Sequence, residues 1–254
     1  MTSATRSGPS LSPERPTAVS PHPETGRGFP AIETDNGEDP STATDPEGHP
    51  LATFLVDLSA ELMRQRLREA LTVYVQAMNY PRGTEEQRAS MWLEHTRRSG
   101  WKAVAALRTD ATDVDSPAVL DSAQMLGIAY GYRGAPDQWW QQQVVHGLRR
   151  RGAEGARAEP LLADYFELTE LHIHPQAQGQ GLGEALARRL LAGRGEANVL
   201  LSTPEINEEA NRAWRLYRRL GFGDVIRDYH FAGDPRPFAI LGRRLPLDQA
   251  PGTD

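Results

Sequence analysis

A glycine-rich segment at residues 178–183, Gln-Gly-Gln-Gly-Leu-Gly, has the composition of a main-chain anion site. It follows a segment with strand character, Tyr165–Ile173, that stops at Pro175, and it precedes a predicted helix that begins at about Leu182. Glycine has no Cβ, so the backbone of such a turn can approach a phosphate closely. The first N–H groups of a helix lack intrahelical partners and add donors to the same place. The segment therefore predicts a pyrophosphate cradle.

Two common phosphate-binding motifs do not fit this spacing. A P-loop ends in Gly-Lys-Ser/Thr, whereas Gly183 is followed by Glu184, and Lys102 is the single lysine in the chain. A dinucleotide fingerprint needs Gly-x-Gly-x-x-Gly, and counting from Gly179 puts Glu184 in place of the third glycine. The spacing therefore disfavours a nucleoside triphosphatase and a dinucleotide-binding fold.

The same residues match the pattern Gln/Arg-x-x-Gly-x-Gly/Ala, which resembles the acetyl-CoA signature of the GCN5-related N-acetyltransferase (GNAT) superfamily. Two more segments resemble this family in the right order. Glu167-Leu-x-x-Leu-x-Ile-x-Pro175 is similar to its fourth strand, and residues 211–222 are similar to its last helix, which ends in Tyr-x-x-x-Gly-Phe. The resemblance is strong over about residues 164–231 and looser over residues 51–163.

The resemblance implies an α/β fold with a mixed central β-sheet flanked by helices. It also implies an acetyl-CoA-dependent N-acetyltransferase, in which a primary amine attacks directly within a ternary complex. The amine must lose a proton, the thioester oxygen must be stabilised as it becomes anionic, and the departing thiolate must be protonated or held. This chemistry needs no metal, and we expect none. The cofactor-binding residues that the resemblance implies are Leu171, Ile173, Gln178, Gly179, Gln180, Gly181, Leu182, Gly183 and Asn211.

Glu167 and Glu170 are the candidate general bases. The family often has a glutamate at the position of Glu167, which in several members draws the proton through water. The two residues lie three apart on one predicted strand, so regular alternation places them on opposite faces. A carboxylate half buried in a cleft has a raised pKa, which suits a base, and a solvated or ion-paired glutamate is the alternative for each. His172 is a further candidate base, and it shares a strand face with His174, although no third metal ligand is apparent nearby.

Tyr217 matches the family tyrosine that lies beside the cofactor sulfur, so it is the candidate acid for the thiolate. It also belongs to an apolar helical stripe, and a tyrosine can pack its ring while presenting its hydroxyl. Asn211 matches the family asparagine that contacts the pantetheine arm. In this family the fourth and fifth strands part, which would free main-chain groups near Leu171 and Ile173 to pair with the cofactor.

The acceptor is expected between the first helix pair and the last hairpin, as in the family. Candidate residues there are Trp139, Trp140, Tyr80, Arg82 and the 229–238 turn. The tryptophan pair could stack on a substrate or simply pack in the core. A small-molecule amine and a protein amine are both open as acceptors, and a homodimer is open as an assembly.

Periodicity and turn residues predict the elements that position these motifs. Strands are predicted at 53–58, 102–107, 124–132, 165–173, 199–203, 222–231 and 237–245, and helices at 61–78, 84–98, 136–150, 182–192 and 208–220. Relative to the family, the helix after the third strand is inserted. Thr84 is expected to cap the second helix, with Gln87 completing a capping box.

The first fifty residues differ from the rest of the chain. They hold nine of the nineteen prolines, eight acidic residues and three arginines, and they lack apolar periodicity. Such a segment cannot bury enough apolar surface to offset chain entropy. We expect a disordered acidic tail rich in Pro, Ser and Thr at 1–50, one N-acetyltransferase domain at 51–247 and a short tail at 248–254.

Composition excludes several other functions. The absence of cysteine excludes disulfides, thiolate metal sites and a cysteine nucleophile. Residues 51–254 are nearly neutral, so no basic surface predicts a nucleic-acid partner. No segment is typical of a signal peptide or a membrane span, so we expect a soluble, cytoplasmic protein without a membrane partner. The rival hypothesis is a non-catalytic CoA-sensing or interaction module with the same fold.

Overall fold

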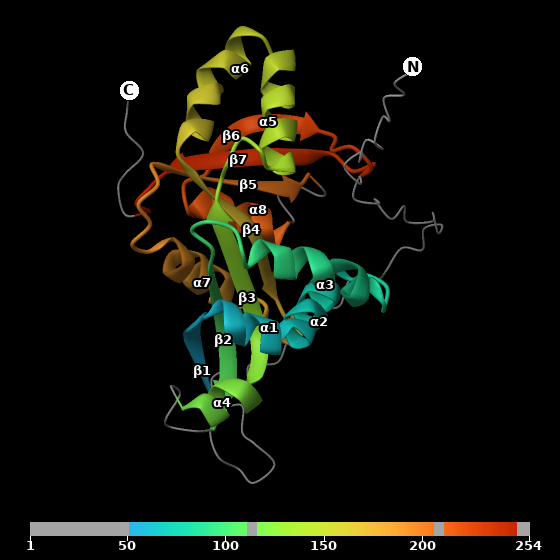
Figure 1. Cartoon of the computed structure of the whole chain (residues 1–254), viewed down its shortest axis with the longest axis vertical. Helices are drawn as coiled ribbons and strands as arrows, with labels where there is room; N and C mark the ends of the chain where they lie inside the picture. The colour runs from blue at the N-terminus through green and yellow to red at the C-terminus, as the bar shows by residue number, and fades with distance from the viewer. Residues whose placement is uncertain (1–50, 111–115, 206–210, 248–254) are drawn as a thin grey trace, which may run out of the picture.

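A computed structural model describes residues 51–110, 116–205 and 211–247, so the predicted tails at 1–50 and 248–254 lie outside the described residues. The described strands form one mixed seven-stranded sheet in the order β1-β2-β3-β4-β5-β7-β6 (Figure 1). Neighbouring strands are antiparallel except β4 and β5, which are parallel. The strands are β1 (Ala52–Leu58), β2 (Lys102–Thr109), β3 (Gln124–Arg133), β4 (Tyr165–Ile173), β5 (Asn198–Pro204), β6 (Gly223–Tyr229) and β7 (Phe238–Arg244).

Helices cover both faces of this sheet, which confirms the predicted fold class. They are α1 (Ala60–Gln65), α2 (Leu67–Met78), α3 (Thr84–His95), α4 (Pro117–Ser122), α5 (Trp139–Arg150), α6 (Ala153–Ala158), α7 (Leu182–Leu191) and α8 (Arg212–Arg219), with 3₁₀ turns η1 (Glu159–Ala163) and η2 (Pro175–Ala177). The predicted inserted helix after the third strand is α5, and α6 and η1 extend this insertion. No helix of the described ranges is long and apolar enough to span a membrane.

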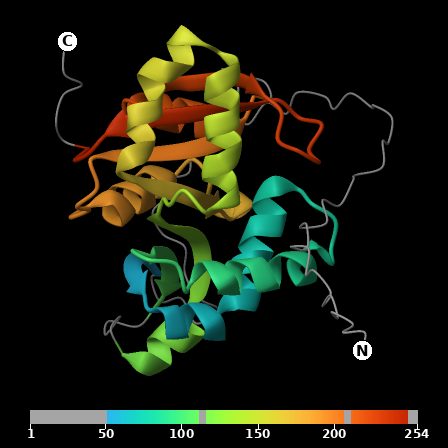
Figure 2. The same cartoon turned by 45° about the horizontal axis from the view of Figure 1, so that its top comes forward.

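Three apolar clusters hold the layers together. On one face of the sheet, α7 and α8 pack residues such as Leu186 and Trp214 against Phe166. On the other face, α1 to α3 cover β1 to β3, and α5 and α6 cover β5 to β7. Figure 2 shows these last two helix groups as separate blocks. The central strands β3 and β4 therefore run from beneath one block toward the other.

The parallel pair β4 and β5 separates after three residues. Register pairing joins Tyr165 to Asn198 and ends where Glu167 pairs with Leu200. Beyond Glu167, β4 continues to Ile173 beside β3 alone, while β5 continues beside β7. The edge of β4 that faces away from β3 is therefore left without a strand partner over residues 168–173, as the family resemblance implied.

A β-bulge at Thr169 changes the predicted arrangement of β4. Glu170 pairs with Tyr130, but Leu168 pairs with Gly131, so Thr169 is the extra residue. The bulge reverses the alternation: Glu167 and Glu170 lie on the same face, and Leu168 joins Leu171 and Ile173 in the cluster on the opposite face. The prediction that the two glutamates point to opposite faces is therefore wrong, because it assumed a regular strand.

The predicted helix at 61–78 is in fact two helices, which meet at Arg66. The buried Arg66 side chain donates to the Leu120 and Ala123 carbonyls, and its Nε donates to Glu69 at 3.0 Å. The apolar stripe continues through the break, so periodicity alone could not reveal it. The same contacts hold α4, a helix that is not among the predicted elements.

The helix predicted at 84–98, which is α3, also begins differently from the prediction. Gly83, with a φ of 95°, is its N-cap, and Thr84 is the first helical residue. The Thr84 hydroxyl donates to the Pro81 carbonyl at 2.7 Å, while Glu85 accepts from the Gly83 N–H at 2.8 Å. The capping box expected at Thr84 and Gln87 is therefore wrong, because the N-cap is one position earlier and is a glycine, which has no side chain to accept a hydrogen bond.

The Lys102 side chain caps the C-terminal end of α7. Its Nζ donates to the carbonyls of Arg189 and Ala192 at 2.8 and 3.1 Å. These carbonyls belong to the last turn, where the helix has no further N–H groups to satisfy them. A cation there also opposes the negative end of the helix dipole.

Candidate active site

The glycine turn lies between η2 and α7. Gly179 and Gly181 have φ of 85° and 79°, values that favour glycine, and a Cβ at either would face open space. Gly181 is the N-cap of α7. The N–H groups of residues 179–183 donate to no other described residue. The turn therefore offers a row of available donors at a helix N-terminus, which is the geometry of an anion site.

Gln178 fixes this turn to two other elements. Its Nε2 donates to the Ile173 carbonyl at 3.1 Å, and its Oε1 accepts from Arg212 at 2.7 Å. At the other side of the turn, a Cβ on Gly183 would lie 3.2 Å from Leu216 and 3.8 Å from Leu171. The turn, the open part of β4 and α8 are therefore brought together, although the three motifs are separate in the sequence.

Asn211 is the N-cap of α8. Its Oδ1 accepts from the backbone N–H groups of Ala213 and Trp214 at 2.9 and 3.4 Å. This capping role was not predicted. The pantetheine contact implied by the resemblance stays a prediction.

Glu167 lies at the point where β4 and β5 part. The residue is only 4% exposed, and Oε1 accepts a hydrogen bond from the Tyr132 hydroxyl at 3.2 Å. Oε2 is buried without a hydrogen-bond partner among the described residues. Burial raises the pKa of Glu167 to about 7, against the opposing effects of Arg98 and the Tyr132 hydrogen bond. A carboxylate with this pKa can accept a proton near neutral pH.

Glu170 and His172 form a second acid–base pair further along the same face of β4. His172 Nε2 lies 2.5 Å from Glu170 Oε2, and both side chains keep some exposure. The His172 ring packs edge-on against Tyr74 of α2, with ring centroids 4.9 Å apart. His174 instead accepts from the Gln176 N–H. The two histidines thus have different partners, and no three metal-ligating side chains cluster within the described ranges.

Tyr217 lies across the open edge, on α8. Its ring is buried and packs edge-on against Phe222 at 5.6 Å between centroids. The hydroxyl makes no hydrogen bond within the described part of the chain. Burial, and then the charge of Glu170, raise the pKa of Tyr217 well above its usual value. The ring of Tyr217 therefore has the packing role, and its role as the acid for the thiolate stays a prediction.

The expected acceptor residues divide into two groups. Tyr80, in the turn after α2, accepts from Arg236 at 3.0 Å, and Arg236 is paired with Asp234 in the β6–β7 turn. The first helix pair and the last hairpin are therefore in contact, and Arg82 is exposed on the same turn as Tyr80.

The tryptophan pair belongs to α5 instead. Trp140 is buried, with Nε1 3.3 Å from Ser202, whereas Trp139 is 45% exposed beside Phe231. Trp140 is therefore a packing residue, and Trp139 keeps a surface for contact.

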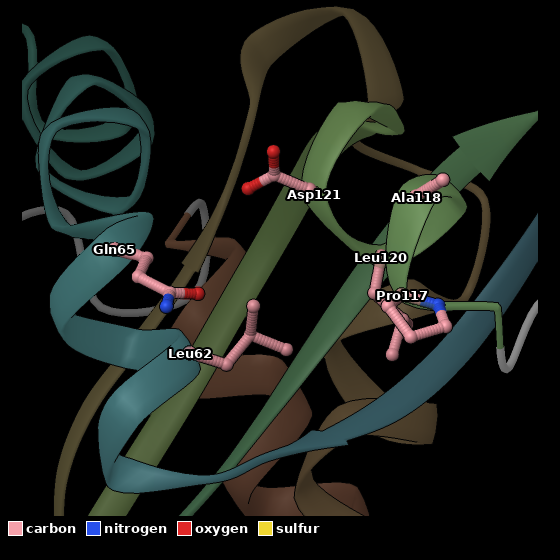
Figure 3. A pocket seen from close by; sticks show the side chains of 6 residues that line it. All are labelled: Leu62, Gln65, Pro117, Ala118, Leu120 and Asp121. Carbon is pink, nitrogen blue, oxygen red and sulfur yellow. The ribbon is translucent and has the colours of Figure 1, made fainter.

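A recess between α1 and α4 is separate from these residues. It is lined by Leu62, Gln65, Pro117, Ala118, Leu120 and Asp121 (Figure 3). The helix α4 precedes the start of β3, whereas Tyr132 stands near the end of that strand. The recess therefore contributes no side chain to the candidate site.

The residues that sequence reasoning missed are Tyr132 and Arg98. Tyr130 and Tyr132 are two apart in a predicted strand, so their shared face could be expected. The contacts of Tyr132 with Glu167 and with Arg98 depend on strand pairing and on the bulge, and neither can be read from the sequence.

The site combines an open β4 edge, a glycine turn at a helix N-terminus and a buried carboxylate, the arrangement that the resemblance to acetyl-CoA-dependent acyltransferases implied. Residues 141–223 match the family model described as an acetyltransferase (GNAT) domain. A GCN5-like protein acetyltransferase of Mycobacterium tuberculosis is 66% identical over 206 residues, which span 78% of this chain and all of that protein. The chain therefore belongs to the GNAT acetyltransferase family, whose members are acyltransferases that use acetyl-CoA.

Solved structures of the family are more distant. The ribosomal-protein-S18-alanine N-acetyltransferase of Escherichia coli is 18% identical, with coverage of 78% of this chain and 96% of that chain and a TM-score of 0.46. NAA60 of Arabidopsis thaliana, in complex with a bisubstrate analogue, is 13% identical, with coverage of 77% of this chain and 100% of that chain and a TM-score of 0.47. The family assignment rests on the mycobacterial relative.

Proposed function

We propose that this protein is an acetyl-CoA-dependent N-acetyltransferase that acetylates a primary amine by direct attack in a ternary complex. The observation that carries the proposal is the juxtaposition of the unpaired β4 edge with the donors of residues 179–183. Main-chain groups on a strand edge can pair with an extended amide-containing arm, and free N–H groups at a helix N-terminus suit a pyrophosphate.

The residues present fit acetyl-CoA, which supplies the acetyl group as a thioester. The turn Gln178 to Gly183 would hold the pyrophosphate, and the main chain at Leu171 and Ile173 would hold the pantetheine arm, together with Asn211. The side chains of Leu171 and Ile173 face the α7–α8 cluster, so the main chain is what this edge offers.

Glu167 is the proposed base. Its partnerless Oε2 can take the amine proton, directly or through a water, as the nitrogen forms its bond to the acetyl carbon. Because the pKa of Glu167 is about 7, the carboxylate is substantially ionised at neutral pH and still basic enough to accept a proton.

Tyr217 is the proposed donor to the sulfur when the carbon–sulfur bond breaks. A thiol has a pKa near 8.5, and the pKa of Tyr217 is raised by burial, so complete transfer of the phenolic proton is unfavourable. We therefore expect Tyr217 to donate a hydrogen bond to the departing thiolate rather than to lose its proton first.

The Glu170–His172 pair is the second candidate base. The specific observation in its favour is exposure: both side chains retain access to solvent, whereas Glu167 is almost fully buried. The side chains of His172 and Glu170 are 11% and 16% exposed, so an acceptor amine has a more direct approach to this pair than to Glu167.

A protein amine is the favoured acceptor class. The mycobacterial relative is described as a protein acetyltransferase, and its identity with this chain extends over 206 residues. An exposed aromatic side chain, Trp139, beside the β6–β7 hairpin is also suited to contact with a macromolecule.

Release of CoA thiol from acetyl-CoA, measured with lysine-bearing proteins and peptides, peptide α-amines and small amines, tests this function. Glu167→Gln should lower turnover by about 10²–10⁴-fold and remove the acidic limb of the pH–rate profile, with partial rescue at high pH. Glu154→Gln, on the exposed surface of α6, is the matched control and should keep wild-type turnover.

Two results would change the assignment. If Glu170→Gln or His172→Gln abolishes the acidic limb while Glu167→Gln keeps it, the base is the second pair. If acetyl-CoA binds but no acceptor class is turned over, the protein is a non-catalytic CoA-binding module.

A further inference from the structure

Tyr132 and Arg98 surround the Glu167 carboxylate from outside β4. Tyr132 lies on β3, opposite Glu167 in the register, is 2% exposed and donates its hydroxyl to Oε1. Arg98, in the turn after α3, places its guanidinium 4.5 Å from the centre of the Tyr132 ring. A cation over an aromatic face is attractive, so Arg98 holds the phenol ring in place.

The contact makes the two oxygens of Glu167 inequivalent. Oε1 accepts from Tyr132 at 3.2 Å, whereas Oε2 is buried and without a partner among the described residues. A carboxylate can rotate about its last side-chain bond, and a hydrogen bond to one oxygen limits that rotation. Oε2 then has both of its lone-pair sites available for a proton, whereas one site of Oε1 is already occupied.

We propose that Tyr132, supported by Arg98, is a positioning residue that binds Oε1 of Glu167 and so reserves Oε2 for the proton of the acceptor amine. This inference rests on the proposed function of Glu167 as the base. Tyr132 keeps its own proton throughout, since it acts as a donor to the ionised carboxylate.

The other titratable groups facing this contact do not replace Tyr132. They are His95 on α3, Tyr130 on β3, and Tyr165 and Glu170 on β4. The Tyr130 hydroxyl lies 3.0 Å from His95 Nδ1, and the Tyr165 hydroxyl donates to Gln141. Burial, and then Arg98, lower the pKa of His95 to about 3, so this ring is neutral and adds no charge. Arg98 is thus the cation of this group, and Tyr132 is the hydroxyl that donates to Oε1. The Thr169 hydroxyl, which has a smaller lowering effect on the pKa of Glu167, donates to the Glu167 carbonyl at 3.3 Å.

The test compares pH–rate profiles of Tyr132→Phe and Tyr130→Phe with acetyl-CoA and one acceptor. Loss of the Tyr132 hydroxyl removes a hydrogen bond that favours ionised Glu167. The acidic limb of kcat should therefore move to higher pH by about one unit, with a roughly tenfold loss of rate below it. Acetyl-CoA affinity should not change. Tyr130→Phe removes a neighbouring buried hydroxyl that bonds to His95 instead. The acidic limb of the pH–rate profile of this variant should therefore stay at the wild-type pH.

Arg98 provides a second variant that leaves both tyrosines intact. Arg98→Gln removes the cation, whose charge lowers the pKa of Glu167 more than the Tyr132 hydrogen bond does, so it should move the limb in the same direction by at least as much. Arg98→Lys keeps the charge and should retain the wild-type position. In a Glu167→Gln background, adding Tyr132→Phe should have no further effect on the profile.

The outcomes separate this inference from the proposed function. If Glu167→Gln abolishes the limb but Tyr132→Phe and Arg98→Gln leave it unmoved, positioning by Tyr132 is overturned and the base assignment stands. If Glu167→Gln keeps wild-type turnover and profile, the base assignment fails, and the inference fails with it. A limb that moves equally in Tyr132→Phe and Tyr130→Phe would indicate a general packing effect and would also overturn the inference.

Discussion

The glycine turn and the carboxylate face of β4 are the two working parts of the candidate site, and they are made differently. The donors of the turn are main-chain groups of residues 179–183, which follow one another in the chain. The proton-handling face depends on Tyr132 and Glu167, which are 35 residues apart and meet through strand pairing. A local motif therefore specifies the first part, whereas packing across β3 and β4 specifies the second. Mutations should accordingly separate binding from chemistry.

The largest effect is expected from Gly181→Glu in the turn. The added carboxylate places a negative charge among donors that would meet a pyrophosphate, and such a like-charge contact costs several kcal/mol. Affinity for acetyl-CoA, measured by calorimetry, should fall on the order of a hundredfold or more, while the fold survives.

Gly193→Glu is the matched control, because Gly193 also has positive φ and open space but lies beyond the other end of α7. Equal loss of affinity in both variants would show that backbone strain, rather than charge at the turn, is responsible.

A smaller effect, confined to chemistry, is expected from Tyr217→Phe. The ring packing against Phe222 is kept and only the hydroxyl is lost, so acetyl-CoA affinity should change little. Turnover should fall by about 10²-fold, without rescue at high pH, because a lost donor is not replaced by a deprotonated amine. Tyr165→Phe, whose buried hydroxyl donates to Gln141 Oε1, is the control. Loss of affinity in step with turnover would contradict the separation of the two regions.

The third effect concerns the stability of the carboxylate face rather than binding or turnover. The pKa of Glu167 rises from 4.5 to about 7 on folding, so the folded state binds more protons than the unfolded chain between these values. This residue's contribution to the free energy of unfolding therefore falls as pH rises through that window. Each pKa unit corresponds to about 1.4 kcal/mol, so Glu167→Gln should gain stability relative to wild type, by a few kcal/mol, between pH 4.5 and 7. Urea unfolding at several pH values measures the free energy of unfolding of wild type and Glu167→Gln. If the two free energies change in parallel with pH, the pKa of Glu167 is not raised.

The sequence predicted the parts of the fold that local signals specify. β4 has its predicted bounds, Tyr165–Ile173, because a strand-like run meets Pro175, and α7 begins at Leu182 because Gly181 ends the turn. The bulge at Thr169 escaped prediction, since the extra residue is defined only against its partner strand β3.

The helix break at Arg66 escaped for a similar reason. That side chain bonds to carbonyls 54 and 57 residues away, which no local pattern contains. The hydrogen bond of Tyr132 to Glu167 also joins residues that are far apart in the sequence, so no local pattern contains it. Candidate bases could be named from the sequence, but the groups that tune and orient them could not.

Lys102 has a practical consequence for assays of this protein. It is the single lysine of the chain, and its ammonium group is bound to the end of α7 opposite the glycine turn. Helix α7 packs on the face of the sheet that carries Leu168, so this amine is held on the face opposite the Glu167 carboxylate, the proposed base. Acetyl-lysine detected in a reaction with a protein acceptor would therefore report on the acceptor, with little background from self-modification.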